Sequence, residues 1–74
     1  MVETIKNILA EASGWDSDDI KDDINLIKGL GLSSLDVINL VVEFEDAFEI
    51  EVADEDIKTL QTVGDVIAYI EERA

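Results

Sequence analysis

Apolar residues recur every three or four positions along most of this 74-residue chain, which is the spacing of amphipathic helices. The first such segment spans residues 2–12 and ends before Ser13-Gly14, a pair typical of helix ends. The chain has no proline and only four glycines, which favours helices over a turn-rich β fold. It also has no cysteine or histidine, so neither a disulfide nor a Cys/His zinc site can stabilise it. We therefore predict an all-α fold held by its hydrophobic core.

Three further helices are expected along the chain. The second begins at Ser33 or Ser34 and ends near Phe48, and a short third runs from Asp54 to about Leu60. The fourth begins at Thr62. Capping boxes mark two of these starts: Ser33 with Asp36, and Thr62 with Asp65.

Residues 15–27 form a long acidic connector after the first helix. We expect Ile20, Ile24 and Leu26 to hold it against the bundle, with room for one short helical turn. Its acids do not fit a calcium-binding loop, because the required glycine position, counted from Asp16, is Lys21. No metal site is therefore predicted. The fold expected is a four-helix bundle forming one domain over residues 1–74, with a short third helix and a long connector.

Charge restricts the possible partners. Nineteen acidic residues against five basic ones give a net charge of -14, which repels nucleic acid and anionic membranes. No apolar run approaches the roughly 20 residues needed to span a bilayer. We expect a cytoplasmic monomer without membrane insertion, whose partners have basic surfaces. Residues 29–57 strengthen this expectation, since they contain nine acids and no base. A merely solvated acidic surface is the alternative.

The second helix has more apolar residues than one buried face requires. A helical wheel groups six of them as the expected core face: Val37, Leu40, Val41, Phe44, Ala47 and Phe48. Leu35, Ile38 and Val42 form a separate strip bordered by acids. Either this helix is buried over an unusually wide arc, or the strip is a docking surface with a charged rim.

The chain shows no sign of catalysis. Serine needs a base to act as a nucleophile, and no histidine is present. Nothing indicates a lysine desolvated beside a serine hydroxyl. We predict that the protein is not an enzyme.

The segment Leu30-Gly31-Leu32-Ser33-Ser34-Leu35-Asp36 resembles the attachment motif of acyl carrier proteins, which usually reads Leu-Gly-x-Asp-Ser-Leu. Residues 51–56 (EVADED) and 62–70 (TVGDVIAYI) resemble later parts of that family, so the likeness covers about residues 2 to 72. It implies that Ser34 carries 4'-phosphopantetheine, transferred from coenzyme A by a phosphopantetheinyl transferase. The implied function is to carry acyl intermediates as thioesters to enzymes of fatty-acid, polyketide or related lipid metabolism.

The resemblance also implies roles for other residues. Positions that the family uses to dock basic acyl-transferring or synthase enzymes fall on Leu35, Asp36, Ile38, Val42, Glu45 and Asp46. Plain core is the default role of such apolar positions. The candidates to line a cavity for the acyl chain are Leu40, Val41, Phe44, Ile57, Leu60 and Ile67.

Four positions depart from the family pattern. Ser33 and Gly29 stand where acids are usual, Asn39 replaces a glutamate, and Ala53 replaces a proline. These departures suggest a specialised carrier and leave Ser33 as a rival attachment residue. The alternatives are an aminoacyl or peptidyl carrier protein, or an acidic helical interaction module without a prosthetic group.

Overall fold

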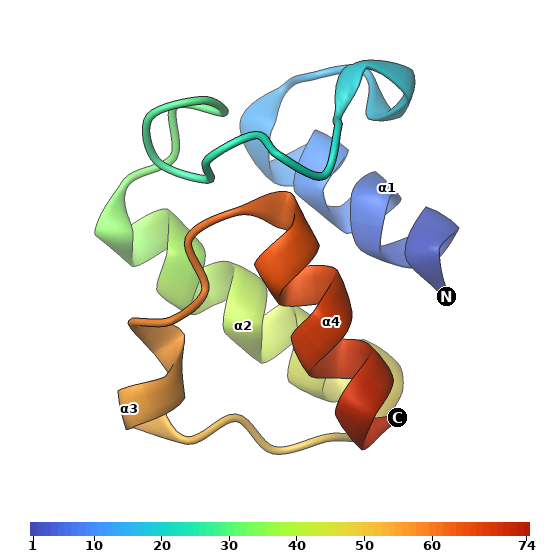
Figure 1. Cartoon of the computed structure of the whole chain (residues 1–74), viewed down its shortest axis with the longest axis vertical. Helices are drawn as coiled ribbons and strands as arrows, with labels where there is room; N and C mark the ends of the chain where they lie inside the picture. Colours follow the sequence, from blue (N-terminus) through green and yellow to red (C-terminus); the bar gives the residue numbers. More distant parts are fainter.

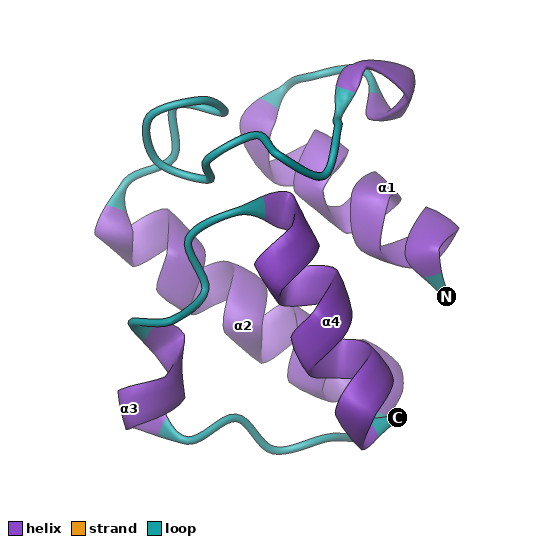
Figure 2. Cartoon of the chain, in the orientation of Figure 1, coloured by secondary structure: helices purple, strands orange, loops and turns teal.

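The computed structural model describes all of residues 1–74 and contains helices joined by loops (Figures 1 and 2). The helices are α1 (Val2–Ser13), α2 (Ser34–Phe48), α3 (Asp54–Ile57) and α4 (Val63–Arg73), and one 3-10 turn covers Ser17–Asp19. α1, α2 and α4 pack together, while α3 lies at the edge of the molecule away from α1 (Figure 1). The predicted all-α fold of four helices is confirmed.

The core consists of fifteen buried side chains, and every one of them is hydrophobic. All three long helices contribute to it, and so does the connector, whose Ile20 and Leu26 are almost fully buried. Ile24 packs against the same core. The long connector is therefore part of the hydrophobic core, as its three apolar residues predicted. Burying them stabilises a loop that has little regular structure of its own.

Both predicted capping boxes are present. Ser33 and Asp36 exchange hydrogen bonds at the start of α2, and Thr62 and Asp65 do the same at the start of α4. Each box satisfies backbone N–H groups that have no carbonyl partner within the helix. These local signals explain why the starts of both helices were predicted to within one residue.

Two predicted features are wrong in detail. α3 ends at Ile57 and not near Leu60, because the next amides turn back by three residues: Thr59 N–H donates to the Asp56 carbonyl, and Leu60 N–H to that of Ile57. Ala47 is exposed although the wheel placed it on the core face. It lies about 80° from Val37 on the wheel, at the edge of the buried arc.

Candidate functional site

The two serines before α2 have different environments. The Ser33 hydroxyl oxygen accepts a hydrogen bond from Asp36 N–H at 3.1 Å, and Ser33 N–H donates to Asp36 Oδ2 at 3.0 Å. Ser34 is the first residue of α2, is exposed, and makes no side-chain hydrogen bond within the chain. The Ser33 hydroxyl is thus used in capping, whereas the Ser34 hydroxyl is exposed and has no partner within the chain.

The start of α2 also favours an anion beside Ser34. The first N–H groups of a helix have no carbonyl partner and carry a partial positive charge. α2 has fifteen residues, so this partial charge is fully developed. A phosphodiester on the Ser34 oxygen would lie next to these amides, where a negative group is stabilised. The residues present therefore fit a phosphate-linked prosthetic group.

A cleft of about 840 Å³ opens beside Ser34. Its walls come from four parts of the chain: residues 25–28, the first turns of α2, α3, and residues 58–61. Apolar side chains line part of it, among them Val37, Ile57 and Leu60. A flexible chain attached to Ser34 can therefore reach an apolar surface without crossing the bundle.

Asn25 shapes the wall of the cleft that precedes α2, and sequence reasoning missed it. Its side-chain oxygen accepts hydrogen bonds from Ile27 N–H at 3.0 Å and Lys28 N–H at 2.9 Å. Its carbonyl accepts from Gly29 N–H and Leu30 N–H, both at 2.9 Å. Asparagine commonly stabilises turns in this way, so an Asn followed shortly by Gly was an available signal.

This wall is fixed to the other side of the cleft by backbone hydrogen bonds. Leu26 N–H donates to the Gln61 carbonyl at 2.8 Å, and Val63 N–H donates to the Ile24 carbonyl at 3.0 Å. Because these bonds join the connector to Gln61, just before α4, and to Val63, the first residue of α4, they frame the cleft on that side.

The six candidates for an acyl cavity all belong to the hydrophobic core or pack against it, but they do not line one cleft. Ile57 and Leu60 line the cleft beside Ser34. Leu40 lines a smaller cleft of about 320 Å³ between α1 and α2. The remaining three, Val41, Phe44 and Ile67, are core residues that line neither cleft.

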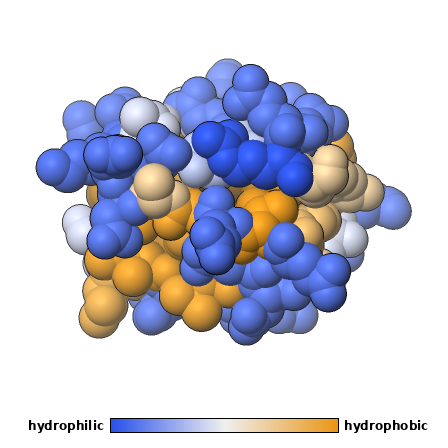
Figure 3. All heavy atoms as spheres, turned by 90° about the horizontal axis from the view of Figure 1, so that it is seen from below, coloured by the Kyte–Doolittle hydropathy of each residue, from blue (hydrophilic) through white to orange (hydrophobic).

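The apolar strip on α2 faces solvent. Leu35, Ile38 and Val42 are 65%, 47% and 51% exposed. The alternative of an unusually wide buried arc on α2 is therefore wrong. Figure 3 views the end of the molecule that lies at the bottom of Figure 1, and its apolar surface gathers toward the side of α2 and α3, bordered by hydrophilic side chains.

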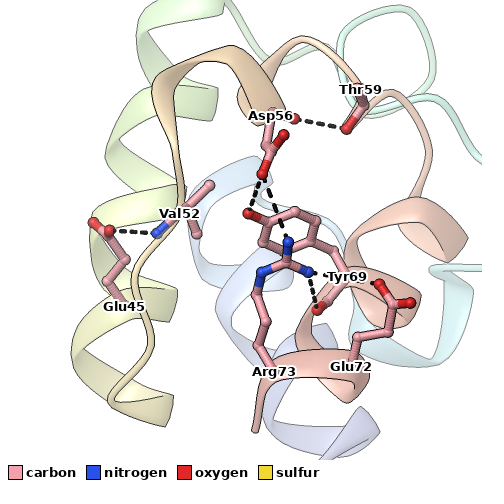
Figure 4. Close-up of polar contacts among 7 residues, drawn as sticks. All are labelled: Glu45, Val52, Asp56, Thr59, Tyr69, Glu72 and Arg73. Atoms are coloured by element: carbon pink, nitrogen blue, oxygen red, sulfur yellow. Dashed lines mark hydrogen bonds and ion pairs between the residues drawn. The ribbon is translucent and has the colours of Figure 1, made fainter.

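The three acids proposed for docking differ in whether their carboxylates have hydrogen-bond partners within the chain. Asp46 is exposed and has no partner, whereas Asp36 is part of the capping box. The Glu45 carboxylate accepts a hydrogen bond from Val52 N–H at 2.9 Å, which ties the loop after α2 back to the helix (Figure 4). Glu45 thus has a structural role that the sequence did not reveal.

A clasp of three side chains holds α3, one wall of the cleft, against α4 (Figure 4). The Tyr69 hydroxyl donates to Asp56 Oδ2 at 2.7 Å, and Arg73 Nη2 lies 3.7 Å from the same oxygen. The Arg73 guanidinium stacks 3.6 Å from the centre of the Tyr69 ring. A helix of four residues is not stable alone, so the position of α3 depends on such contacts.

Replacing Tyr69 with phenylalanine should loosen this clasp. The ring and its contact with Arg73 remain, but the hydrogen bond to Asp56 is lost, so we expect a loss of about 1 kcal/mol in the free energy of unfolding. Amide exchange should accelerate in α3 more than in α1. Denaturant unfolding measures the first effect and hydrogen exchange the second. If the substitution accelerated exchange equally in α1 and α3, the clasp would not be local.

The hydrogen bond between Tyr69 and Asp56 should make the protein less stable at alkaline pH. Partial burial, and then the hydrogen bond to Asp56, raise the pKa of Tyr69 above its usual range. The contribution of this group to stability is complete below pH about 10 and is lost as the pH rises through the raised pKa. Because Tyr69 is the only tyrosine, the ultraviolet absorbance of its phenolate reports this ionisation directly. The Tyr69→Phe variant should lack this component of the alkaline loss.

None of the helices combines the length and apolar character needed to cross a membrane. No group of three or more acidic side chains converges as metal ligands would.

Comparison with known proteins gives consistent matches. Residues 3–70 match the family described as "Phosphopantetheine attachment site". The chain is 44% identical over 70 residues to an acyl carrier protein of Akkermansia muciniphila, covering 95% of this chain and 88% of that protein. It is 39% identical over 69 residues to one of Thermotoga maritima, covering 93% and 85%.

Solved structures agree with these matches. The crystal structure of an acyl carrier protein of Thermotoga maritima superposes with a TM-score of 0.80 at 33% identity, covering 95% of this chain and 81% of that one. An acyl carrier protein of Enterococcus faecalis gives a TM-score of 0.86 at 29% identity, covering 99% and 92%.

Proposed function

Because this chain belongs to the acyl carrier protein family, we propose that Ser34 is the residue to which its 4'-phosphopantetheine arm is joined. One observation supports this assignment above all. Of the two serines in the motif, Ser33 uses its hydroxyl to cap α2, whereas Ser34 is exposed, unbonded and beside the cleft. Residues 1–74 would act as a single carrier domain.

The joining step requires little of the chain itself. The Ser34 oxygen forms a bond to the phosphorus that bears the pantetheine half of coenzyme A. The diphosphate bridge breaks, its adenosine bisphosphate half leaves, and the hydroxyl proton passes to the transferase. Within the chain, the unpaired amides at the start of α2 stabilise the new phosphodiester. The bound group supplies the thiol that holds an acyl chain as a thioester.

The exposed strip Leu35, Ile38 and Val42 is proposed as the surface that partner enzymes contact. It begins next to Ser34, is apolar at its centre and has the exposed acid Asp46 nearby, an arrangement that suits a partner with basic residues around an apolar patch. The expected partners are the phosphopantetheinyl transferase and enzymes of fatty-acid, polyketide or related acyl metabolism. The chemistry itself would be performed by those partners.

Intact mass tests the proposal. The unmodified protein is incubated with coenzyme A and a phosphopantetheinyl transferase of broad specificity, and then weighed. We expect a gain equal to one phosphopantetheine group, and none when coenzyme A is omitted. An unchanged mass in the complete mixture would contradict the carrier function proposed for this chain.

A further inference from the structure

The few cations of this chain are not distributed evenly. It has five basic residues, and three of them contact acceptors within the chain: Lys6, Lys21 and Arg73. The other two, Lys28 and Lys58, make no ion pair and no side-chain hydrogen bond. Both line the cleft beside Ser34. The two cations without partners therefore line the same cleft as the proposed attachment residue.

The fold brings these lysines to the cleft from two separate walls. Lys28 is part of the turn organised by Asn25, and Lys58 directly follows α3. One carboxylate, Asp54, lines the same cleft, so its charged side chains number two cations and one anion. In a chain of net charge -14, cations thus outnumber anions among the side chains that line this cleft. Such an excess of cations suits an anionic group.

We propose that Lys28 and Lys58 bind the phosphodiester that joins Ser34 to its arm, an inference that rests on the proposed function. The covalent bond to the Ser34 oxygen keeps the phosphate at a residue that lines the cleft. Lysine ammonium groups bind phosphate as point charges. They also offset the repulsion that the surrounding carboxylates exert on an added negative charge.

This contact would set the direction in which the arm leaves Ser34. A phosphate held between Lys28 and Lys58 directs the arm into the cleft, toward Ile57 and Leu60, and away from solvent. The lysines would therefore favour a sheltered position of the arm, in competition with the extended position that a partner enzyme needs.

The test compares the thermal midpoints of unloaded and loaded protein, with loading verified by mass. Three proteins are used: the wild type, the Lys28→Gln/Lys58→Gln double variant, and a Lys21→Gln control. Lys21 is exposed and contacts only the Asp18 carbonyl, so the control changes the charge outside the cleft. We expect the midpoint shift on loading to be about 5 °C less favourable in the double variant than in the wild type or the control. Equal shifts in all three proteins would overturn the proposal.

Varying the acyl chain shows whether the lysines bind the phosphodiester or an anionic group on the acyl chain itself. Each protein is also loaded with acyl chains of equal length that end in a methyl group or a carboxylate. The effect of the two lysines should already be complete with the bare arm. An effect seen only with the carboxylate would overturn the phosphodiester assignment and identify the cargo as the group that the lysines bind.

A titration without covalent loading separates this inference from the proposed function. Free 4'-phosphopantetheine added to the unmodified protein should shift the side-chain NMR signals of Lys28 and Lys58, whereas pantetheine, which lacks the phosphate, should not. If the protein cannot be loaded, the proposed function fails and this titration still tests the anion site. Identical responses to both compounds would overturn it.

Discussion

Replacing Ser34 with alanine should abolish attachment of the arm completely while leaving the protein as stable as before. The lost hydroxyl makes no hydrogen bond within the chain, and alanine is a good residue for the first turn of a helix. No mass gain is therefore expected after incubation with coenzyme A and the transferase. The free energy of unfolding should change by less than about 0.5 kcal/mol, the usual range for an exposed site.

Ser33→Ala is the matched control and should have the opposite pair of effects. It removes the oxygen that caps α2, so the free energy of unfolding should fall by about 1 kcal/mol. Loading should still proceed to the same final mass, because the Ser34 hydroxyl remains. If Ser33→Ala prevented loading and Ser34→Ala did not, the attachment residue would be Ser33.

Features that depend on neighbouring residues could be predicted from the sequence. The start of α2 is one of these, because Ser33 and Asp36 are close enough along the chain to form the capping box by themselves. The spacing of Leu35, Ile38 and Val42 similarly placed all three on one face outside the core. Such patterns follow from helix geometry alone.

The cleft, which depends on residues far apart in the sequence, could not be predicted. The cleft beside Ser34 is framed by hydrogen bonds between residues 24–26 and residues at the start of α4, and its two lysines come from two distant segments of the chain. Nothing local to Lys28 or Lys58 indicates that they share a cleft. Periodicity likewise shows which residues face inward but not which of them border an opening, so it could not tell which of the six acyl-cavity candidates line the cleft beside Ser34.

The largest effect on stability outside the core is expected for Gly29→Ala. A Cβ atom at Gly29 would lie 2.5 Å from Ile24 Cγ2 and 2.6 Å from the Asn25 carbonyl oxygen. The second of these is a backbone atom that already accepts two hydrogen bonds within the turn, so it cannot move freely. Forcing a methyl group into such a space usually costs about 1–3 kcal/mol, a large part of the stability of so small a domain.

Gly31 provides a contrast within the same loop. Its φ of +78° is in the left-handed region, but no atom lies within 4 Å of a Cβ added there. Asparagine tolerates this conformation. Gly31→Asn should therefore lower the free energy of unfolding far less than Gly29→Asn. Denaturant unfolding measures both losses.

The Gly29 variants also address why this chain lacks the acid that the family usually has at that position. If Gly29→Ala destabilises the turn as strongly as expected, the absence of the acid follows from the tight packing of the turn, because any side chain would displace the wall that carries Lys28. If Gly29→Ala left the free energy of unfolding unchanged, the turn would be able to shift and accommodate a side chain. The missing acid would then have to be explained by charge alone, since a carboxylate at residue 29 would stand beside the lysine proposed to bind the phosphodiester.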